Sequence, residues 1–344
     1  MNKAGLVKQI LLGVIVIIIL LVIINFELVT YGLSQGYGQM KILIGARPIE
    51  DVMLDDGVDN QVKQKLVLVD AIRHYAMQDL GLKNSKNYTT FYDQKGEPLL
   101  WIVRACEPYK LENVEWTFPF VGTVSYKGYF NLNKAIKLRD QLRKNGYDTY
   151  IREVSAWSTL GWFKDPILSE MLNDEAGDLA NTIIHELTHA TIFVDDSITF
   201  NENLASFIGD KGAEEFLGNE YPDSEQLAEY RNLKEDRAKY SSHFLAGAKY
   251  LDSLYSTYTE EMSEPEKKNS KEVAIRLIVD KLDTINFHNA AFRERFEDIL
   301  PNNAYFMSYL LYRSGQESLD SLYNMQYDGD LRLFISAMKK LHPN

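Results

Sequence analysis

The sequence contains a single cysteine, Cys106, and it has fewer basic than acidic residues. One cysteine excludes a framework of internal disulfides and a zinc site made of several cysteines. Because 37 lysines and arginines stand against 49 acidic residues, the net charge of -12 disfavours nucleic acid as a partner and argues against membrane binding through a basic patch. No internal repeat or low-complexity tract is apparent. We expect an ordinary folded chain in which Cys106 is a small, buried apolar residue.

Apolar residues are abundant, since they make up 45% of the 344 residues, which is enough for a sizeable core in one large or two small domains. Strand-like alternation is found in the first half of the chain, whereas helical periodicity dominates after Glu175. Strands and helices that are segregated along the chain predict an α+β fold. We expect residues 1–30 to form an N-terminal anchor and residues 31–344 a folded domain, whose helices from about residue 220 could form a C-terminal subdomain.

Several segments predict individual elements. Residues 88–92 and 99–103 both alternate between apolar and polar, and the turn-like segment between them predicts a β-hairpin. The polar residues 260–271 predict an exposed loop. The expected helices, from their apolar periodicity, are residues 60–82, 133–145, 178–193, 201–217, 224–258, 271–282, 303–313 and 329–341.

Residues 6–24 form an apolar run in which Lys8 is the one charged residue. A helix of about 20 residues crosses a hydrocarbon core of roughly 30 Å, so this run predicts a transmembrane helix. Lys3 and Lys8 lie at its start and Glu27 follows it, which places the N-terminus in the cytoplasm and the rest of the chain outside. A cleaved signal peptide is the alternative, but no small-x-small cleavage site follows the run. We therefore favour a retained single-pass anchor in the cell membrane.

The segment His185-Glu186-Leu187-Thr188-His189 carries the clearest chemical signal. Residues four apart lie on one face of a helix, so His185 and His189 can present two imidazoles to one metal ion. A carboxylate next to the first histidine, here Glu186, reaches the metal-bound water rather than the metal. The alternative is a pair of core histidines that make ordinary hydrogen bonds. The apolar residues around the motif supply the buried side of such a helix.

A catalytic zinc ion needs a third protein ligand and an open position for water. Twelve residues separate His189 from Glu202, and Asn201 before it could cap a second helix that folds back antiparallel against the first. Glu202 would then lie in the first turn of that helix. The residues that share its helical face are small, which permits a close approach of the two helices: Ala205, Ser206 and Gly209. We expect Glu202 to be the third ligand.

Four other residues are alternative third ligands by spacing: Asp195, Asp196, Glu214 and His243. The two aspartates are close to the end of the first helix, and Glu214 faces away from Glu202 by helical count. His243 could be a ligand, a donor to the transition state or a core histidine, of which we favour the last.

The predicted chemistry is metal-assisted hydrolysis of a peptide bond by one zinc ion, which lowers the pKa of its water towards about 7. Glu186 would take the proton of that water and return it to the leaving amine. A second donor is needed for the developing oxyanion. Many tyrosines could supply it, and the sequence does not choose among them: Tyr126, Tyr129, Tyr240 and Tyr305 are examples.

At these residues the chain resembles a family of bacterial aminopeptidases of the gluzincin type, which have a zincin-like fold, the two-histidine helix motif and a downstream glutamate ligand. The similarity also includes residues 118–122, 126–130, 157–166, 200–202 and 302–304. The resemblance implies that His185, His189 and Glu202 bind zinc, that Glu186 is catalytic, and that the substrate is a peptide. Many members have a lipoprotein cysteine after the apolar segment, whereas Asn25-Phe26 stands here. A retained helix would replace that lipid anchor.

The leading hypothesis is thus a membrane-anchored zinc aminopeptidase whose catalytic domain lies outside the cytoplasm and whose partners are peptides and the lipid bilayer. A zinc endopeptidase is one alternative, because no residue in the sequence identifies a group that would hold a free amino terminus. A membrane-anchored scaffold with a structural zinc ion is the other. A fourth protein ligand would distinguish a structural site from a catalytic one, since it would fill the water position.

Overall fold

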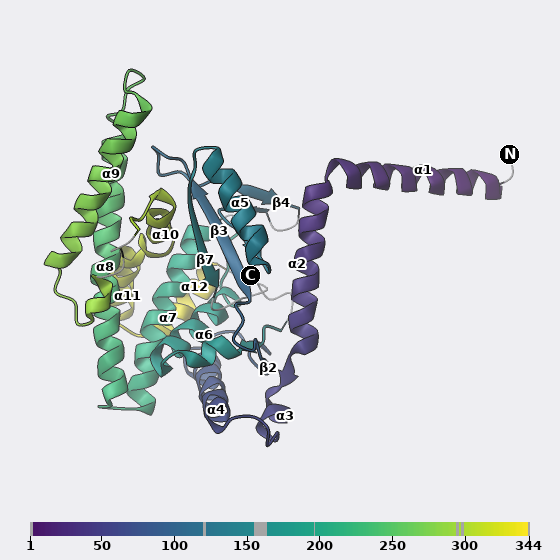
Figure 1. Ribbon diagram of the computed structural model, residues 1–344. Coiled ribbons are helices and arrows are strands. Elements are labelled where there is room, and N and C mark those ends of the chain that lie inside the picture. Colours follow the sequence, from purple (N-terminus) through teal and green to yellow (C-terminus); the bar gives the residue numbers. More distant parts are fainter. Residues whose placement is uncertain are drawn as a thin grey trace. The chain divides into compact units, whose positions relative to one another are not determined.

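The computed structural model describes residues 3–119, 122–154, 164–195, 197–293, 296 and 299–342. The chain divides into two compact units, Met1–Gly45 and Ala46–Asn344, and Figure 1 shows their helices and strands. In the larger unit the strands precede the motif helix and almost all later elements are helices. The predicted α+β class is therefore confirmed.

The smaller unit consists of two helices, α1 (Lys3–Ile24) and α2 (Phe26–Gly45). The window Val7–Ile24 has a mean hydropathy of 3.1. Within the described residues, α1 is the one helix that is long and apolar enough to cross a membrane, and a signal sequence near an N-terminus would meet the same criterion. The membrane anchor stays a prediction.

The larger of two three-stranded sheets is antiparallel and has the strand order β6 (Lys127–Tyr129), β3 (Leu100–Cys106), β7 (Asp148–Val154). Side chains alternate along β3, so Val103 and Ala105 face α5 (Leu132–Lys144) and share a core with it. Arg104 points to the opposite face, against which α10 (Asn303–Arg313) packs. Cys106 is free and fully buried, as expected.

The other three-stranded sheet has the order β1 (Arg47–Pro48), β2 (Thr90–Tyr92), β8 (Ile167–Leu168). β2 pairs antiparallel with β1 and parallel with β8, so the hairpin predicted between residues 88–92 and 99–103 is wrong. The two segments separate because Phe91 packs in the core around the motif helix, whereas the second segment, in β3, pairs with β6 and β7. A separate short hairpin joins β4 (Trp116–Phe118) and β5 (Gly122–Val124).

Helices build the rest of the larger unit. They are α3 (Ile49–Met53), α4 (Asn60–His74), η1 (Tyr75–Asp79), η2 (Ser169–Asn173), α6 (Ala176–His189), α7 (Ile198–Glu220), α8 (Glu225–Tyr255), α9 (Glu264–Asp280), η3 (Lys281–Thr284), η4 (Ala290–Phe292), α11 (Gln316–Tyr327) and α12 (Leu331–Leu341). One core joins α4, α6, α7 and α12, and a second, rich in aromatic rings, joins α8, α9 and α10.

Two helix starts differ from the prediction by three residues or more. α9 begins at Glu264, so the expected loop over residues 260–271 is largely wrong. The cause is a capping box, in which Ser263 Oγ and the Ser263 amide both pair with Glu266, and Pro265 in the first turn. The helix α7 begins at Ile198, before the predicted residue 201. α11 has no counterpart among the predicted helices.

The approach of α6 and α8 generates a prediction about stability. A Cβ atom at Gly177 would lie 2.3 Å from Cδ2 of Tyr230 and 3.0 Å from Cδ1 of Leu217. We expect Gly177→Ala to lower the free energy of unfolding by about 1–3 kcal/mol because the buried ring of Tyr230 has to move. Gly218→Ala is the matched control, because Gly218 lies in α7 with no atom near its Cβ position, and we expect it to stabilise by about 0.5–1 kcal/mol. Denaturant unfolding of both variants measures the difference, and equal stabilities would contradict the packing.

Candidate metal centre

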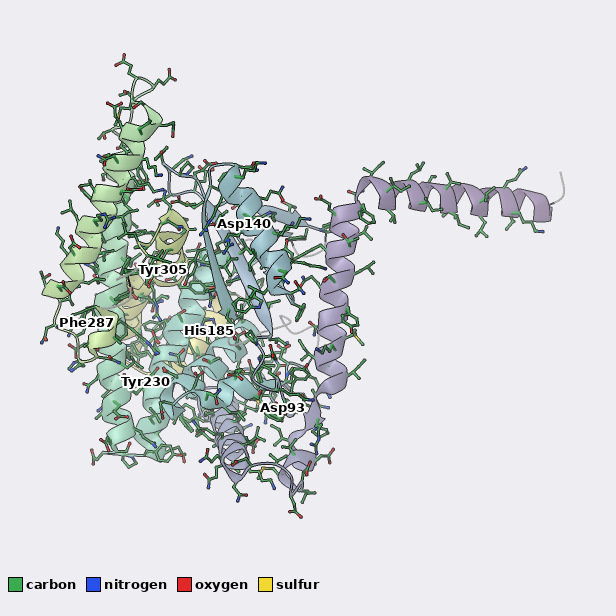
Figure 2. All side chains as sticks on the ribbon, viewed as in Figure 1. Asp93, Asp140, His185, Tyr230, Phe287 and Tyr305 are labelled. Atoms are coloured by element: carbon green, nitrogen blue, oxygen red, sulfur yellow. The ribbon has the colours of Figure 1, made fainter. Side chains whose placement is uncertain are left out.

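The helix α6 carries both motif histidines. Its buried side is formed by Leu179, Ile183 and Ile184, none of which is measurably exposed. The opposite edge of the helix presents His185 and His189, which lie in its last two turns. Figure 2 labels His185 on this helix. α6 ends at His189 rather than at the predicted residue 193. The amphipathic helix that the apolar periodicity predicted is thus confirmed, and the two imidazoles lie on the face opposite its apolar side.

The helix α7 lies close against α6, as the small residues in its sequence predict. A Cβ atom at Gly209 would lie 3.0 Å from the backbone oxygen of Asn181 and 3.3 Å from Cβ of His185. Any larger side chain would push α7 away from the motif helix. Gly209 is therefore a point of close approach on which the position of Glu202 depends.

The sequence suggested that Asn201 caps α7, but the helix already begins at Ile198, so Asn201 lies within it. Glu202 lies in the second turn of α7 rather than in the first. The amide of Asn201 instead holds the loop that joins α6 and α7. The backbone N–H of Val194 donates to Asn201 Oδ1 at 2.8 Å, and Asn201 Nδ2 donates to the carbonyl of Val194 at 2.8 Å. This pair of hydrogen bonds sets where the second helix starts.

The arrangement brings three ligand atoms together from two helices. His185 Nε2 and His189 Nε2 are 3.1 Å apart, and they lie 3.6 Å and 3.7 Å from Glu202 Oε2. Their potential ligand atoms all lie within 4.8 Å of one another. The three side chains that the sequence singled out as zinc ligands therefore face a single point.

The spacing fits a tetrahedral zinc ion. Ligands bound at about 2.0–2.1 Å in this geometry lie about 3.3 Å from one another, close to the distances between the three atoms. Two imidazoles and one carboxylate are also a common ligand set of catalytic zinc. In the described part of the chain, no other histidine, cysteine or acid joins the group.

Charge within the group shifts two pKa values. Burial would raise the pKa of the Glu202 carboxyl, but hydrogen bonds to His185 and His189 and their charges lower it to about 2. Burial opposes protonation of His189, whereas its hydrogen bond to Glu202 and the charges of Glu202 and Glu186 leave its pKa raised. The metal-free cluster is thus held together as an ion pair.

Comparison with known proteins identifies the family of the chain. Residues 30–344 match the protein family described as "Putative aminopeptidase". The chain belongs to this family. No curated protein and no solved structure matches it. The aminopeptidase family that the sequence resembles is confirmed, whereas the gluzincin type of the site stays a prediction. Phe120, Val121 and residues 157–163, which contribute to the resemblance, lie outside the described residues.

The alternative third ligands of this aminopeptidase-family chain lie elsewhere or have other partners. His243 Nε2 contacts the backbone oxygen of Ile278 at 2.7 Å on the far helix α9. Glu214 forms ion pairs with two cationic side chains of α8. Asp195 is exposed in the loop, and Asp196 lies outside the described residues. None of the described alternatives joins the three-residue group.

Of the tyrosines considered as oxyanion donors, two belong to the aromatic core instead. The hydroxyls of Tyr240 and Tyr305 are 3.0 Å apart, and both rings pack around Phe244. Tyr129 lies in β6, paired with Trp101. Tyr126 differs from them. Burial and the charges of Tyr312, Glu202 and Glu186 raise its pKa to about 12, so its hydroxyl lies in the electrostatic range of the candidate centre.

Three residues near the site were not identified from the sequence. Tyr88 is 1% exposed with a backbone φ of 60°, and burial and the nearby charge of Glu186 raise the pKa of its hydroxyl. Arg104 lies next to the ring of Tyr126 and donates a hydrogen bond to the hydroxyl of Tyr312. Their positions depend on the pairing of β3 with its neighbours and on the docking of α10. A correct strand register would have placed Tyr126 beside Arg104, but no local pattern reveals that register.

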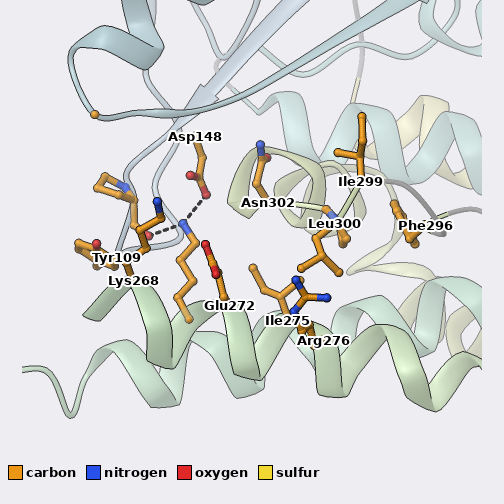
Figure 3. A pocket seen from close by; sticks show the side chains of 14 residues that line it. Tyr109, Asp148, Lys268, Glu272, Ile275, Arg276, Phe296, Ile299, Leu300 and Asn302 are labelled. Atoms are coloured by element: carbon orange, nitrogen blue, oxygen red, sulfur yellow. Dashed lines mark hydrogen bonds and ion pairs between the residues drawn. The ribbon is translucent and has the colours of Figure 1, made fainter. Parts of the chain in front are cut away.

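A cavity of about 570 Å³ lies between α9 and the loops at the ends of β3 and β7 (Figure 3). It shares no lining residue with the candidate metal centre. Inside it, Lys271 Nζ donates to Asp148 Oδ2 at 2.5 Å and to the Pro108 carbonyl at 2.7 Å, and the Asn303 amide donates to the same carboxylate oxygen at 2.8 Å. These contacts fasten α9 and α10 to the sheet, so we assign this cavity a structural role.

The pKa shifts predict a pH window for the stability of the metal-free protein. The stabilisation from Glu202 is present above its unfolded pKa of 4.5 and is lost as the pH falls towards about 2. The stabilisation from His189 is present below its unfolded pKa of 6.5 and is lost as the pH rises through the raised folded value. The two overlap between about pH 4.5 and 6.5.

We therefore expect the melting temperature of chelator-treated wild type to exceed that of Glu202→Gln most strongly within this window. Thermal unfolding from pH 4 to pH 8 measures the difference, and Glu220→Gln, at the exposed end of α7, is the control. A difference that is constant with pH would contradict the ion pair.

Proposed function

We propose that this protein is a zinc-dependent peptidase and that it acts as an aminopeptidase, with His185, His189 and Glu202 as the zinc ligands and Glu186 as the general base. The observation that carries the proposal is the convergence of the three ligand atoms, with separations of 3.1, 3.6 and 3.7 Å. The family match supports peptide hydrolysis as the activity. One zinc ion would be bound.

Three protein ligands leave a tetrahedral zinc ion one open position, and a bound zinc ion would polarise the scissile carbonyl and lower the pKa of a water molecule towards about 7. Glu186 follows His185 directly and is partly accessible, so its carboxylate can reach the open side of the cluster. In the proposed reaction this carboxylate takes the proton of the attacking water and gives it to the leaving amine. The side chain of His189 is 7% exposed, less than those of His185 and Glu202, which are 17% and 21% exposed.

The open position also favours an enzyme over a scaffold with a structural zinc ion. A structural site is closed by a fourth protein ligand. Among the described residues, which do not include Asp196, the only group of this kind has three members, which supports a free position for water. An endopeptidase would use the same residues, and the difference between the two activities depends on what holds the amino terminus of the substrate.

We propose that α1 is a retained transmembrane anchor, with the N-terminus in the cytoplasm and the catalytic unit outside. Its apolar window Val7–Ile24 supports a membrane-spanning role. The lysines Lys3 and Lys8 at its start support this orientation by the positive-inside rule. The lipid bilayer and extracytoplasmic peptides would then be the partners of the chain.

Replacement of the general base tests the proposed chemistry. We expect Glu186→Gln to reduce kcat/KM for an unblocked peptide library by about 100-fold or more, while zinc remains bound at one ion per chain. Metal analysis and peptide cleavage measure the two quantities on the same sample. Glu220→Gln is the matched control and should retain full activity.

Unchanged cleavage by Glu186→Gln would disprove the mechanism, and absence of bound zinc in the wild type would disprove the metal centre. The same library with blocked amino termini tests the aminopeptidase activity. Cleavage of the unblocked peptides alone is expected. Equal cleavage of both sets would identify an endopeptidase.

The anchor is tested by the mass and location of the full chain expressed in bacteria. We expect the mature protein to retain residues 1–30, to sediment with membranes, and to be degraded by protease added to spheroplasts. A variant that lacks residues 1–25 should appear in the soluble fraction. A mature protein that has lost the N-terminal segment and is released from the membrane would identify a cleaved signal peptide instead.

A further inference from the structure

A buried cation lies on the sheet beside the candidate metal centre. Arg104, in the middle of β3, is 2% exposed. In the part of the chain that the structure describes, no carboxylate lies within 4.0 Å of its guanidinium, and its Nε atom is buried without a hydrogen-bond partner. An arginine side chain stays charged at any ordinary pH, so this burial is unfavourable unless an anion completes the site.

Three other arginines, of which Arg73 is buried and two are partly exposed, differ from Arg104 in this respect. Arg73 pairs with Asp70 and also donates to two backbone carbonyls. Arg237 makes a two-point contact with Asp178, with distances of 2.6 and 3.0 Å. Arg313 pairs with Asp210 at 2.6 Å. Arg73, the other buried arginine of the described residues, therefore has a carboxylate partner, as do the partly exposed Arg237 and Arg313, whereas Arg104 has none.

Two tyrosines hold the guanidinium of Arg104 in place. Its Cζ atom lies 5.9 Å from the ring centre of Tyr126 and 5.4 Å from that of Tyr312, within the range of cation–π contacts. Its Nη2 atom donates to the hydroxyl oxygen of Tyr312 at 3.2 Å. Since this oxygen accepts, its own proton can be donated to a ligand. The group thus offers donors from both Arg104 and Tyr312.

The position of Tyr312 is tied to the metal-binding helix. Asn203, the residue after Glu202, donates to the carbonyl of Leu311 at 2.7 Å and accepts from the amide of Gly315 at 2.8 Å. These two bonds fix the end of α10 against α7. Burial and the charge of Glu202 raise the pKa of Tyr312, which agrees with a short separation between them.

The same region is open to solvent at its edge. Tyr126 as a whole residue is 36% exposed although its hydroxyl is desolvated, and the side chains of His185 and Glu202 are 17% and 21% exposed. A ligand can therefore approach the metal-binding atoms and the Arg104 group from one side. Arg152, on β7, faces the same side of the sheet, because it pairs with Ile102 two residues from Arg104, and it adds a second positive charge.

We propose that Arg104 and Tyr312 form a subsite that binds a carboxylate of the peptide substrate beside the metal centre. The proposal rests on the proposed peptidase function and names its substrate class, which is peptides that carry a carboxylate near the scissile bond. The planar guanidinium is suited to a carboxylate, because it can donate two parallel hydrogen bonds. A peptide carries such a group either at its C-terminus or on an aspartate or glutamate side chain.

Matched peptides separate the two sources of the carboxylate. One pair is Ala-Ala-Ala with a free C-terminus and its C-terminal amide. The other pair consists of the amides of Ala-Glu-Ala and Ala-Gln-Ala. For wild type loaded with zinc, we expect the carboxylate member of at least one pair to have a kcat/KM about 10-fold to 100-fold higher, the range for a hydrogen bond to a charged group. The pair that shows the preference identifies the source.

We expect Arg104→Met to abolish this preference. The value of kcat/KM should fall for the peptides that carry the carboxylate and stay unchanged for their amide partners. Tyr312→Phe should reduce it while it keeps the aromatic ring, and it serves as the second variant if Arg104→Met does not fold. Arg104→Lys should retain part of the preference. Arg332→Met, at an exposed position of α12, is the matched control and should leave it unchanged.

Binding of the same peptides to zinc-loaded Glu186→Gln, measured by calorimetry, separates this proposal from the peptidase function. Tighter binding of a carboxylate member without hydrolysis by wild type would disprove the function and support the subsite. Hydrolysis by wild type with equal rates within both pairs would overturn the subsite and leave the function intact. An equal loss for all peptides in Arg104→Met would also overturn it, since it would assign Arg104 to the transition state.

Discussion

The close approach of α6 and α7 is the constraint on which the candidate centre depends. The two histidines come from one helix and the carboxylate from the other, so their distance is set by helix packing. Gly209 permits this packing, because a Cβ atom there would lie 3.3 Å from Cβ of His185. Around it, Asn181 of α6 donates to Asp210 of α7 at 2.6 Å, and Arg313 of α10 pairs with the same carboxylate. A partly buried polar network thus joins the three helices in the arrangement that the site requires.

Charge is distributed unevenly around this centre. Glu202 and Glu186 place negative charge on the helical side, which suits a divalent cation. Arg104 and Arg152 place positive charge on the side of the sheet, which suits an anion. The negative side is formed by helices and the positive side by the strands β3 and β7. The helix α10 contacts both α7 and these strands. In the proposed function, a peptide that spans the site would meet the metal-binding residues at one end and the guanidinium of Arg104 at the other.

Structural features that depend only on residues close together in the sequence could be predicted from the sequence. The helical period and the four-residue spacing suffice for α6 and its two histidines, and small residues suffice for the packing of α7. Predictions failed where local signals were ambiguous or overlooked. The alternating segment that became β2 does not encode its partners, so the hairpin was wrong, and the polar residues before α9 form a capping box that resembles a loop in composition.

By itself the sequence determined the candidate metal ligands and the candidate general base, because helical periodicity and residue spacing are local properties of a chain. Only the tertiary structure decided that Glu202, rather than His243 or Glu214, lies within 3.7 Å of the histidines. It also decided that Arg104, Tyr126 and Tyr312 meet at one point. These three residues come from a strand, a loop and a helix separated by up to 208 positions, and strand register and helix docking bring them together.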